Sequence, residues 1–324
     1  MGAGAHMIAA RIALSALAAC SSGSPPPASH RVDKAIAAAI AAADHLAAPW
    51  RCAALDTPAF VDGTVAHDWK LVEHTVSRAK DGDLVIGVVA DAGNASPRTI
   101  AALSRLRSKL EAAKVDLVIT LGGMGSTQGE LEGTLGTLSD HATWPVIALA
   151  GDLEPETAQI AALATLQKRG DPVIDGRLAR WIEIPGVTIG TIPGSGAATR
   201  LVAANDGCGW RPHDIAKLYR ALSEKPGLRV AAMAEAPREI VGGDPAGQLE
   251  LVAGKTQAFD VALHAPTHGA PTPARSGARD GAAVALSPGT SDAMTRLPEP
   301  TLPSAGVLSI RGNAWSWRPV VDQP

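Results

Sequence analysis

The sequence has few aromatic residues and few cysteines, and neither positive nor negative charge is in large excess. Only 3% of its 324 residues are aromatic, so the core must consist of small aliphatic side chains. Three cysteines allow at most one disulfide. There is no block of basic residues and the net charge is -3, so we expect no nucleic-acid partner. The length suits one α/β domain of about 250 residues preceded by an N-terminal extension.

The N-terminus is typical of an export signal. His6 and Arg11 give a weakly positive start, and residues 12–19 form an apolar run too short to span a bilayer. The run ends in Leu-Ala-Ala-Cys, with the cysteine at position 20. This motif resembles the lipobox of bacterial lipoproteins, in which the cysteine becomes the lipidated first residue of the mature protein. The alternative is an apolar N-terminus with a chance cysteine.

The lipobox resemblance implies a lipoprotein of the bacterial cell envelope, attached to a membrane through lipidated Cys20. Ser21, rather than Asp, follows the cysteine and resembles the outer-membrane sorting pattern. We therefore expect a protein of the outer membrane that faces the periplasm. In that oxidising compartment Cys52 and Cys208 can form a disulfide; the alternative is that both are small buried residues.

The chain divides into four predicted segments. The N-terminal extension is expected to be helical, with one helix over residues 33–46 and a second over residues 67–79, where Trp69, Val72 and Val76 lie near one helical face. The segments are a signal peptide (1–19), a Pro/Ser-rich tether (20–32), the helical extension (33–80) and the main domain (81–324).

The main domain begins with a repeated alternation of buried strand and helix. Residues 84–90 are a continuous apolar run that ends at Asp91, and Ser96-Pro97 is a typical helix start. Two further strand–helix units follow, which predicts a parallel, helix-covered sheet. The second half is predicted to have shorter strands at 178–184, 187–192, 228–234, 259–264, 284–287, 305–310 and 314–320, with helices at 212–223 and 247–254.

The ends of five predicted strands are polar or glycine-rich, and ligands of open α/β sheets bind at such ends. In order they are Asp91, Gly122-Gly123, Gly151-Asp152, Glu235-Ala-Pro237 and Thr267-His268. Their order and spacing resemble the calcineurin-like metallophosphoesterases over residues 84–320. The resemblance implies an α/β fold, a layered sandwich of central β-sheets flanked by helices. It also implies two metal ions bridged by one carboxylate, which hydrolyse phosphate esters.

The residues that this chemistry needs are largely replaced. The resemblance places the bridging aspartate at Gly123 and the histidine that protonates the leaving group at Leu153. It also places metal-binding histidines at Gly93 and Pro266. Two cations would repel each other with no carboxylate between them, and leucine cannot donate a proton. A dinuclear phosphatase of the usual kind should not work here.

Four metal-binding positions keep an oxygen or nitrogen donor. They are Asp91, Asp152, Glu235 and His268, where Asp152 stands for an asparagine and Glu235 for a histidine of the family. These donors suit one divalent cation, such as Mg²⁺, Mn²⁺, Ca²⁺ or Zn²⁺. The alternative is that they are remnant polar residues at loop positions.

Three functions remain open. The first is a catalytically degenerate protein of this fold that acts as a binding or structural protein. The second is a phosphoesterase that uses an atypical, mononuclear metal site on a small phosphate ester. The third is an acidic rim that binds a cationic ligand or a partner protein. Metal content and phosphatase activity distinguish the first two.

Overall fold

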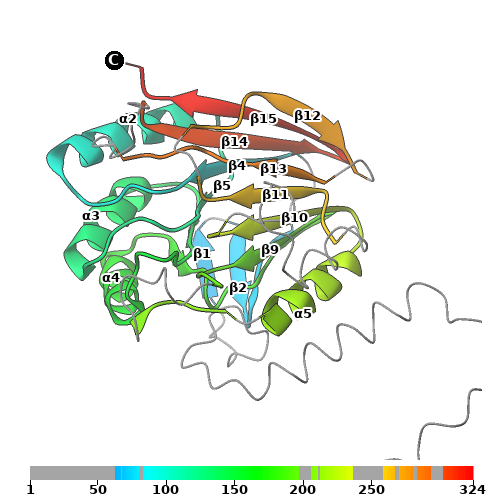
Figure 1. Cartoon of the computed structure of the whole chain (residues 1–324), viewed down its shortest axis with the longest axis horizontal. Coiled ribbons are helices and arrows are strands. Elements are labelled where there is room, and N and C mark those ends of the chain that lie inside the picture. The colour runs from blue at the N-terminus through cyan, green and yellow to red at the C-terminus, as the bar shows by residue number, and fades with distance from the viewer. Residues whose placement is uncertain are drawn as a thin grey trace, which may run out of the picture.

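The computed structural model describes two large sheets that face each other, with helices on their outer sides (Figure 1). Within the described residues no helix is long and apolar enough to cross a membrane. The predictions for Cys20, Cys52, His268 and the helices over 33–46 and 247–254 lie outside these residues. The described residues are 63–66, 68–79, 83–196, 206–210, 212–235, 258–266, 270–279, 283–292 and 302–323.

The seven-stranded sheet contains the predicted strand–helix units. Its order is β12-β15-β14-β4-β5-β6-β7, and β4 to β7 are parallel. Helices α2, α3 and α4 connect these parallel strands, which confirms the predicted helix-covered sheet. The elements are β4 (Leu84–Val89), α2 (Pro97–Ala112), β5 (Leu117–Thr120), α3 (Gln128–Ser139), β6 (Val146–Ala148), α4 (Glu156–Arg169), β7 (Val173–Asp175), β12 (Arg275–Ala278), β14 (Ser304–Arg311) and β15 (Ala314–Val321).

Strand β4 is apolar throughout because both of its faces are covered. Ile86 and Val88 pack into the core between the two sheets, whereas Val89 packs under the helices. Ser96 caps α2, since its hydroxyl accepts a hydrogen bond from the Thr99 N–H. The local sequence thus sets both the strand and the start of the helix that follows it.

The eight-stranded sheet has the order β1-β2-β3-β8-β9-β10-β11-β13. Strands β8 and β9 form the predicted hairpin, and β9, β10, β11 and β13 are parallel. Helix α5 packs Leu218, Tyr219 and Leu222 on the outer face of this sheet. The molecule is therefore the predicted α/β layered sandwich. The elements are β8 (Trp181–Ile184), β9 (Val187–Ile192), α5 (Pro212–Ser223), β10 (Leu228–Met233), β11 (Val261–His264) and β13 (Val284–Leu286).

The predicted helix over residues 67–79 is wrong. This stretch forms strands β2 (Trp69–Val72) and β3 (Thr75–Arg78), which with β1 (Gly63–Ala66) extend the eight-stranded sheet. Trp69 and Leu71 are buried and alternate with exposed residues, so the period is two. Val72, assigned to the buried helical face, is 45% exposed. Part of the predicted helical extension is thus sheet of the main domain.

Cys208 is disulfide-bonded. It is the only cysteine among the described residues, so its partner lies outside them. The proposed pairing with Cys52 stays a prediction.

Candidate functional site

The carboxyl ends of the two sheets are joined to each other by backbone hydrogen bonds. Beyond β9 and β6, the Gly194 N–H donates to the Ala150 carbonyl at 2.7 Å. Beyond β13, the Asp292 N–H donates to the Asp91 carbonyl at 2.9 Å. The strand ends at Asp91 and Gly151 therefore meet loops of the other sheet at one edge of the sandwich, where ligands of α/β sheets usually bind.

Asp91 occupies the start of this edge in a left-handed conformation, with φ of 54°. Such a conformation is uncommon outside glycine, although aspartate tolerates it better than most residues. The Asp91 N–H donates to the Gly122 carbonyl at 2.9 Å and its carbonyl accepts from the Thr290 hydroxyl at 2.8 Å. Two separate loops thus hold the Asp91 backbone in place.

The Asp91 carboxyl lies near two other acids. Burial raises the pKa of Asp91, and the charges of Asp292 and Asp152 raise it further, while a hydrogen bond from Thr290 opposes this change. Asp152 is exposed and Asp292 is half-buried. The structure thus brings Asp91, Asp152 and Asp292 near enough for their charges to interact.

Gly123 packs directly against the backbone of Asp91. A Cβ atom at Gly123 would lie 2.8 Å from the Asp91 Cα, and the φ of Gly123 is +72°. At Gly122 a Cβ would lie 2.6 Å from the Cα of Gly151. Three strand-end loops therefore touch through glycines, and a side chain at position 123 has no room. The position of the bridging aspartate is closed by backbone.

The buried carboxylate of Glu154 holds two of these loops together. It accepts hydrogen bonds from the Gly151 N–H at 2.8 Å and from the Met124 N–H. Burial raises the pKa of Glu154 to about 7, against the hydrogen bonds from Met124, Gly151 and Gly123. Glu154 is 1% exposed, so its oxygens face backbone amides rather than a ligand.

Asp292 lies beside the position that a histidine of the first block would occupy. A Cβ atom at Gly93 would lie 3.3 Å from the Asp292 Oδ2, and Gly93 has φ of +72°. The Asp292 side chain therefore fills part of the space into which that histidine would extend. Gly93 and the carboxyl of Asp292 therefore lie side by side.

The other predicted donors have local hydrogen-bond partners or lie outside the described residues. Glu235 accepts hydrogen bonds from the Ser195 hydroxyl at 3.0 Å and from the Gly196 N–H at 2.8 Å. His264, at the end of β11, is 5% exposed, and burial lowers its pKa. Its Nδ1 contacts the Ala265 carbonyl at 2.7 Å. The Glu235 carboxylate thus stabilises the loop after β9.

These residues do not fit a bridged pair of metal ions. Gly123 leaves no room for a bridging carboxylate, and Leu153 is half-buried where the family has its acid. Among the described residues, no group of three or more His, Cys, Asp or Glu side chains is arranged to hold a metal. A single metal held by Asp91, Asp152, Glu235 and His268 stays a prediction.

Sequence reasoning missed the roles of Glu154 and Asp292. Glu154 was visible as the last residue of the Gly-Asp-Leu-Glu block, and its acidic character was the only signal. No sequence signal pointed to Asp292, because residues 290–292 contact the end of β4 only in the folded chain.

Comparisons with solved structures concern the fold. A structure with TM-score 0.50 and 8% identity is matched over 74% of this chain and 100% of its own. A dimetal phosphatase from Danio rerio gives TM-score 0.46 and 11% identity over 73% and 99%. GAP50, described as the anchor in the inner membrane complex of Plasmodium, gives TM-score 0.49 and 10% identity over 74% and 85%. No family model and no curated protein matches the sequence.

The fold is the α/β layered sandwich that the sequence predicted, and the likeness to these solved structures concerns the fold alone. Among the described residues, the blocks at Asp91, Gly122-Gly123, Gly151-Asp152 and Glu235 each stand at the end of a strand. At these identities the likeness defines the class of fold and not the activity.

Proposed function

We propose that this chain is an exported lipoprotein whose metallophosphoesterase-like domain is catalytically degenerate and acts as a binding or structural protein. The observation that supports this most strongly is the packing of Gly123 against the Asp91 backbone. A bridging carboxylate there would need the strand-end loops to move apart, because its Cβ would lie 2.8 Å from the Asp91 Cα. The Asp91 backbone therefore leaves no room for the Cβ of a bridging aspartate at position 123.

The use of the remaining acids supports the same proposal. Glu154 and Glu235 accept hydrogen bonds from backbone amides of neighbouring loops. Carboxylates used in this way stabilise the loops and offer fewer lone pairs to a metal. Each carboxylate thus holds together neighbouring strand-end loops of its own sheet.

Export and membrane attachment are supported by the lipobox-like sequence and by the disulfide at Cys208. Disulfides persist mainly in oxidising compartments, of which the periplasm is one. We propose attachment through lipidated Cys20 and a periplasmic location at the outer membrane. In cells expressing the chain, Cys20→Ser should abolish incorporation of a labelled fatty acid and release the protein from the membrane fraction. Unchanged labelling in this variant would refute lipidation at Cys20.

The catalytic part of the proposal is tested by metal analysis and phosphatase assays on the purified chain. We expect no stoichiometric metal and no hydrolysis of an aryl phosphate with Mg²⁺, Mn²⁺, Ca²⁺ or Zn²⁺. One bound metal per chain, with turnover that disappears in Asp91→Ala, would instead establish the single-metal phosphoesterase. Glu111→Ala, on the exposed face of α2, is the matched control.

A further inference from the structure

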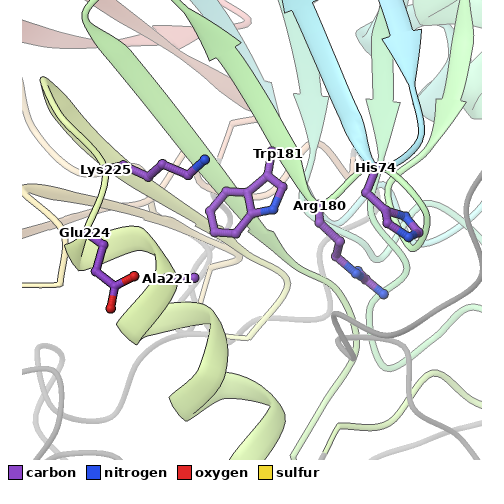
Figure 2. Close-up of a pocket in the computed structure, with 6 residues that line it drawn as sticks. All are labelled: His74, Arg180, Trp181, Ala221, Glu224 and Lys225. Carbon is purple, nitrogen blue, oxygen red and sulfur yellow. The ribbon is translucent and has the colours of Figure 1, made fainter.

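A pocket lies on the side of the eight-stranded sheet that α5 covers. Its volume is about 290 Å³, and it is lined by His74, Arg180, Trp181, Ala221, Glu224 and Lys225 (Figure 2). Three elements contribute: the turn between β2 and β3, the start of β8, and the C-terminal end of α5 with the turn after it. Ligand pockets in proteins usually begin at about 300 Å³, so this one suits a small molecule.

The walls of this pocket are fixed by hydrogen bonds. The His74 carbonyl accepts from the N–H groups of Arg180 and Trp181, at 2.8 and 3.0 Å. The His74 ring contacts the Leu178 carbonyl through Nδ1 at 2.9 Å; since a carbonyl only accepts, Nδ1 donates. Arg180 is 1% exposed and donates to the Gly176 carbonyl. The pocket is therefore preformed.

The half-buried indole of Trp181 forms the apolar wall. Its neighbour in β9 is Gly190, where a Cβ would lie 3.3 Å from the Trp181 Cζ3, so the glycine leaves space for the ring. Ala221 on α5 adds a small apolar side chain to the lining (Figure 2). A planar apolar group can pack against the indole.

Positive charge lies on both sides of that indole. Figure 2 shows the Lys225 side chain reaching toward the ring from one side, with Arg180 and His74 on the other. The Lys225 Nζ is 5.1 Å from the ring centroid and donates to Glu183 at 2.6 Å. An ammonium has three donors, so this ion pair leaves donors for a ligand oxygen. The one acid of the lining, Glu224, is 70% exposed and pairs with Arg220.

We propose that this pocket binds a small aromatic anion, with its ring against Trp181 and its anionic group at the Lys225 ammonium. A cationic ligand is disfavoured because Lys225 already occupies the cation position over the indole and Arg180 adds a second positive charge. A neutral aromatic compound would gain the packing without the charge-assisted hydrogen bond. None of its lining residues is one of the acids or glycines of the strand-end loops, so the proposal does not depend on their chemistry.

The test uses calorimetric titration of the purified full-length chain with three probes of the same shape. These are 2-naphthoate, 2-naphthamide and 2-naphthylmethylammonium. We expect 2-naphthoate to bind roughly tenfold more tightly than the amide, and the ammonium to bind least, because one charge-assisted hydrogen bond is worth about that ratio.

Two variants assign the parts of the pocket. Lys225→Gln should bring the affinity for 2-naphthoate down to that for the amide, and Trp181→Leu should weaken both. Lys114→Gln, an exposed lysine after α2, is the matched control and should bind 2-naphthoate like the unaltered chain. Lys225 is half-buried at the surface, so its variant tests the proposal even if Trp181→Leu fails to fold. Absence of 2-naphthoate binding at millimolar concentration, equal binding by Lys225→Gln, or preference for the ammonium would each overturn the proposal.

Discussion

The edge formed by the strand-end loops and the pocket lined by Trp181 use polar side chains in opposite ways. At the edge, the carboxylates of Glu154 and Glu235 point at backbone amides, and glycines close the remaining space. In the pocket, the side chains of Trp181 and Lys225 line an open volume of about 290 Å³. The strand-end loops and the pocket are therefore formed by different residues of this molecule.

If the proposed loss of a metal site is right, it involves the backbone as well as the ligands. Removing a bridging aspartate by itself would leave a hole. Here the loops of Gly122, Gly123 and Gly151 pack so closely against neighbouring backbone that no such hole remains. Restoring one ligand should therefore fail, whereas the pocket should respond to single side-chain changes.

The largest expected effect follows from Gly123→Asp. We expect a loss of roughly 3 kcal/mol in the free energy of unfolding, because a non-glycine residue at φ of +72° is strained and its Cβ would collide with Asp91. We also expect no gain of phosphatase activity. Denaturant unfolding measures the first and an aryl phosphate assay the second. Gly129→Asp is the control: a Cβ there meets nothing within 4 Å, and an acid in the first turn of α3 is tolerated. A Gly123→Asp protein that is stable and hydrolyses the aryl phosphate would contradict the proposal that the backbone leaves no room for a bridging carboxylate.

A somewhat smaller effect concerns pH. The pKa of Glu154 is about 7 in the folded chain, above the ordinary value of 4.5. Between these values the unfolded chain has released a proton that the native chain still holds, so this group's contribution to stability falls as pH rises. The total change is roughly 3 kcal/mol at most.

Unfolding curves at pH values from 4 to 8 would show this slope. It should largely vanish in Glu154→Gln and persist in Glu111→Gln, which alters an exposed acid on α2. Stability that instead rises steadily through this pH range would mean that the three amides keep Glu154 ionised.

A further, weaker effect is expected for Thr290→Val. The Thr290 hydroxyl donates to the Asp91 carbonyl at 2.8 Å and also lowers the Asp91 pKa. Its loss should cost about 1 kcal/mol in the free energy of unfolding and raise the Asp91 pKa further, as followed by NMR titration of the carboxyl. Thr165→Val, on the exposed side of α4, should change neither quantity appreciably.

The smallest effect on stability is expected for Gly190→Ala, which places a methyl group beside the Trp181 indole of the pocket. The new methyl group would lie 3.3 Å from the Trp181 ring, so the indole must shift slightly. We expect a stability change within about 1 kcal/mol, together with several-fold weaker binding of 2-naphthoate. Unaltered affinity would indicate that the indole position is unimportant for the ligand.

The strongly periodic part of the fold was predictable from sequence. The apolar run of β4, the Ser96-Pro97 start of α2 and the hairpin of β8 and β9 all carry local signals, and all three predictions are confirmed. Strands β7 and β12 were missed; β12 is largely exposed and has no apolar pattern. The segment 67–79 was misread because Trp69 and Val76 fit a helical period as well as the alternation that burial reveals.

The candidate site was predictable only where a strand end sets it. Asp91 and Asp152 follow buried strands, so their shared edge could be inferred from topology. The left-handed conformation of Asp91, the closed space at Gly123 and the approach of Asp292 depend on contacts between loops far apart in the chain. No local pattern encodes those contacts.

The pairing of β14 with β4 has a consequence for the order in which the seven-stranded sheet can close. β4 obtains one of its two neighbours from residues 304–311, more than two hundred positions later. Until those residues emerge, the central strand of the seven-stranded sheet keeps an open edge, and contacts of such high sequence separation form slowly. Secretion machinery threads unfolded chains, so late closure of this sheet would suit the proposed export. The sheet stays open at β4 until residues 304–311 can pair with it.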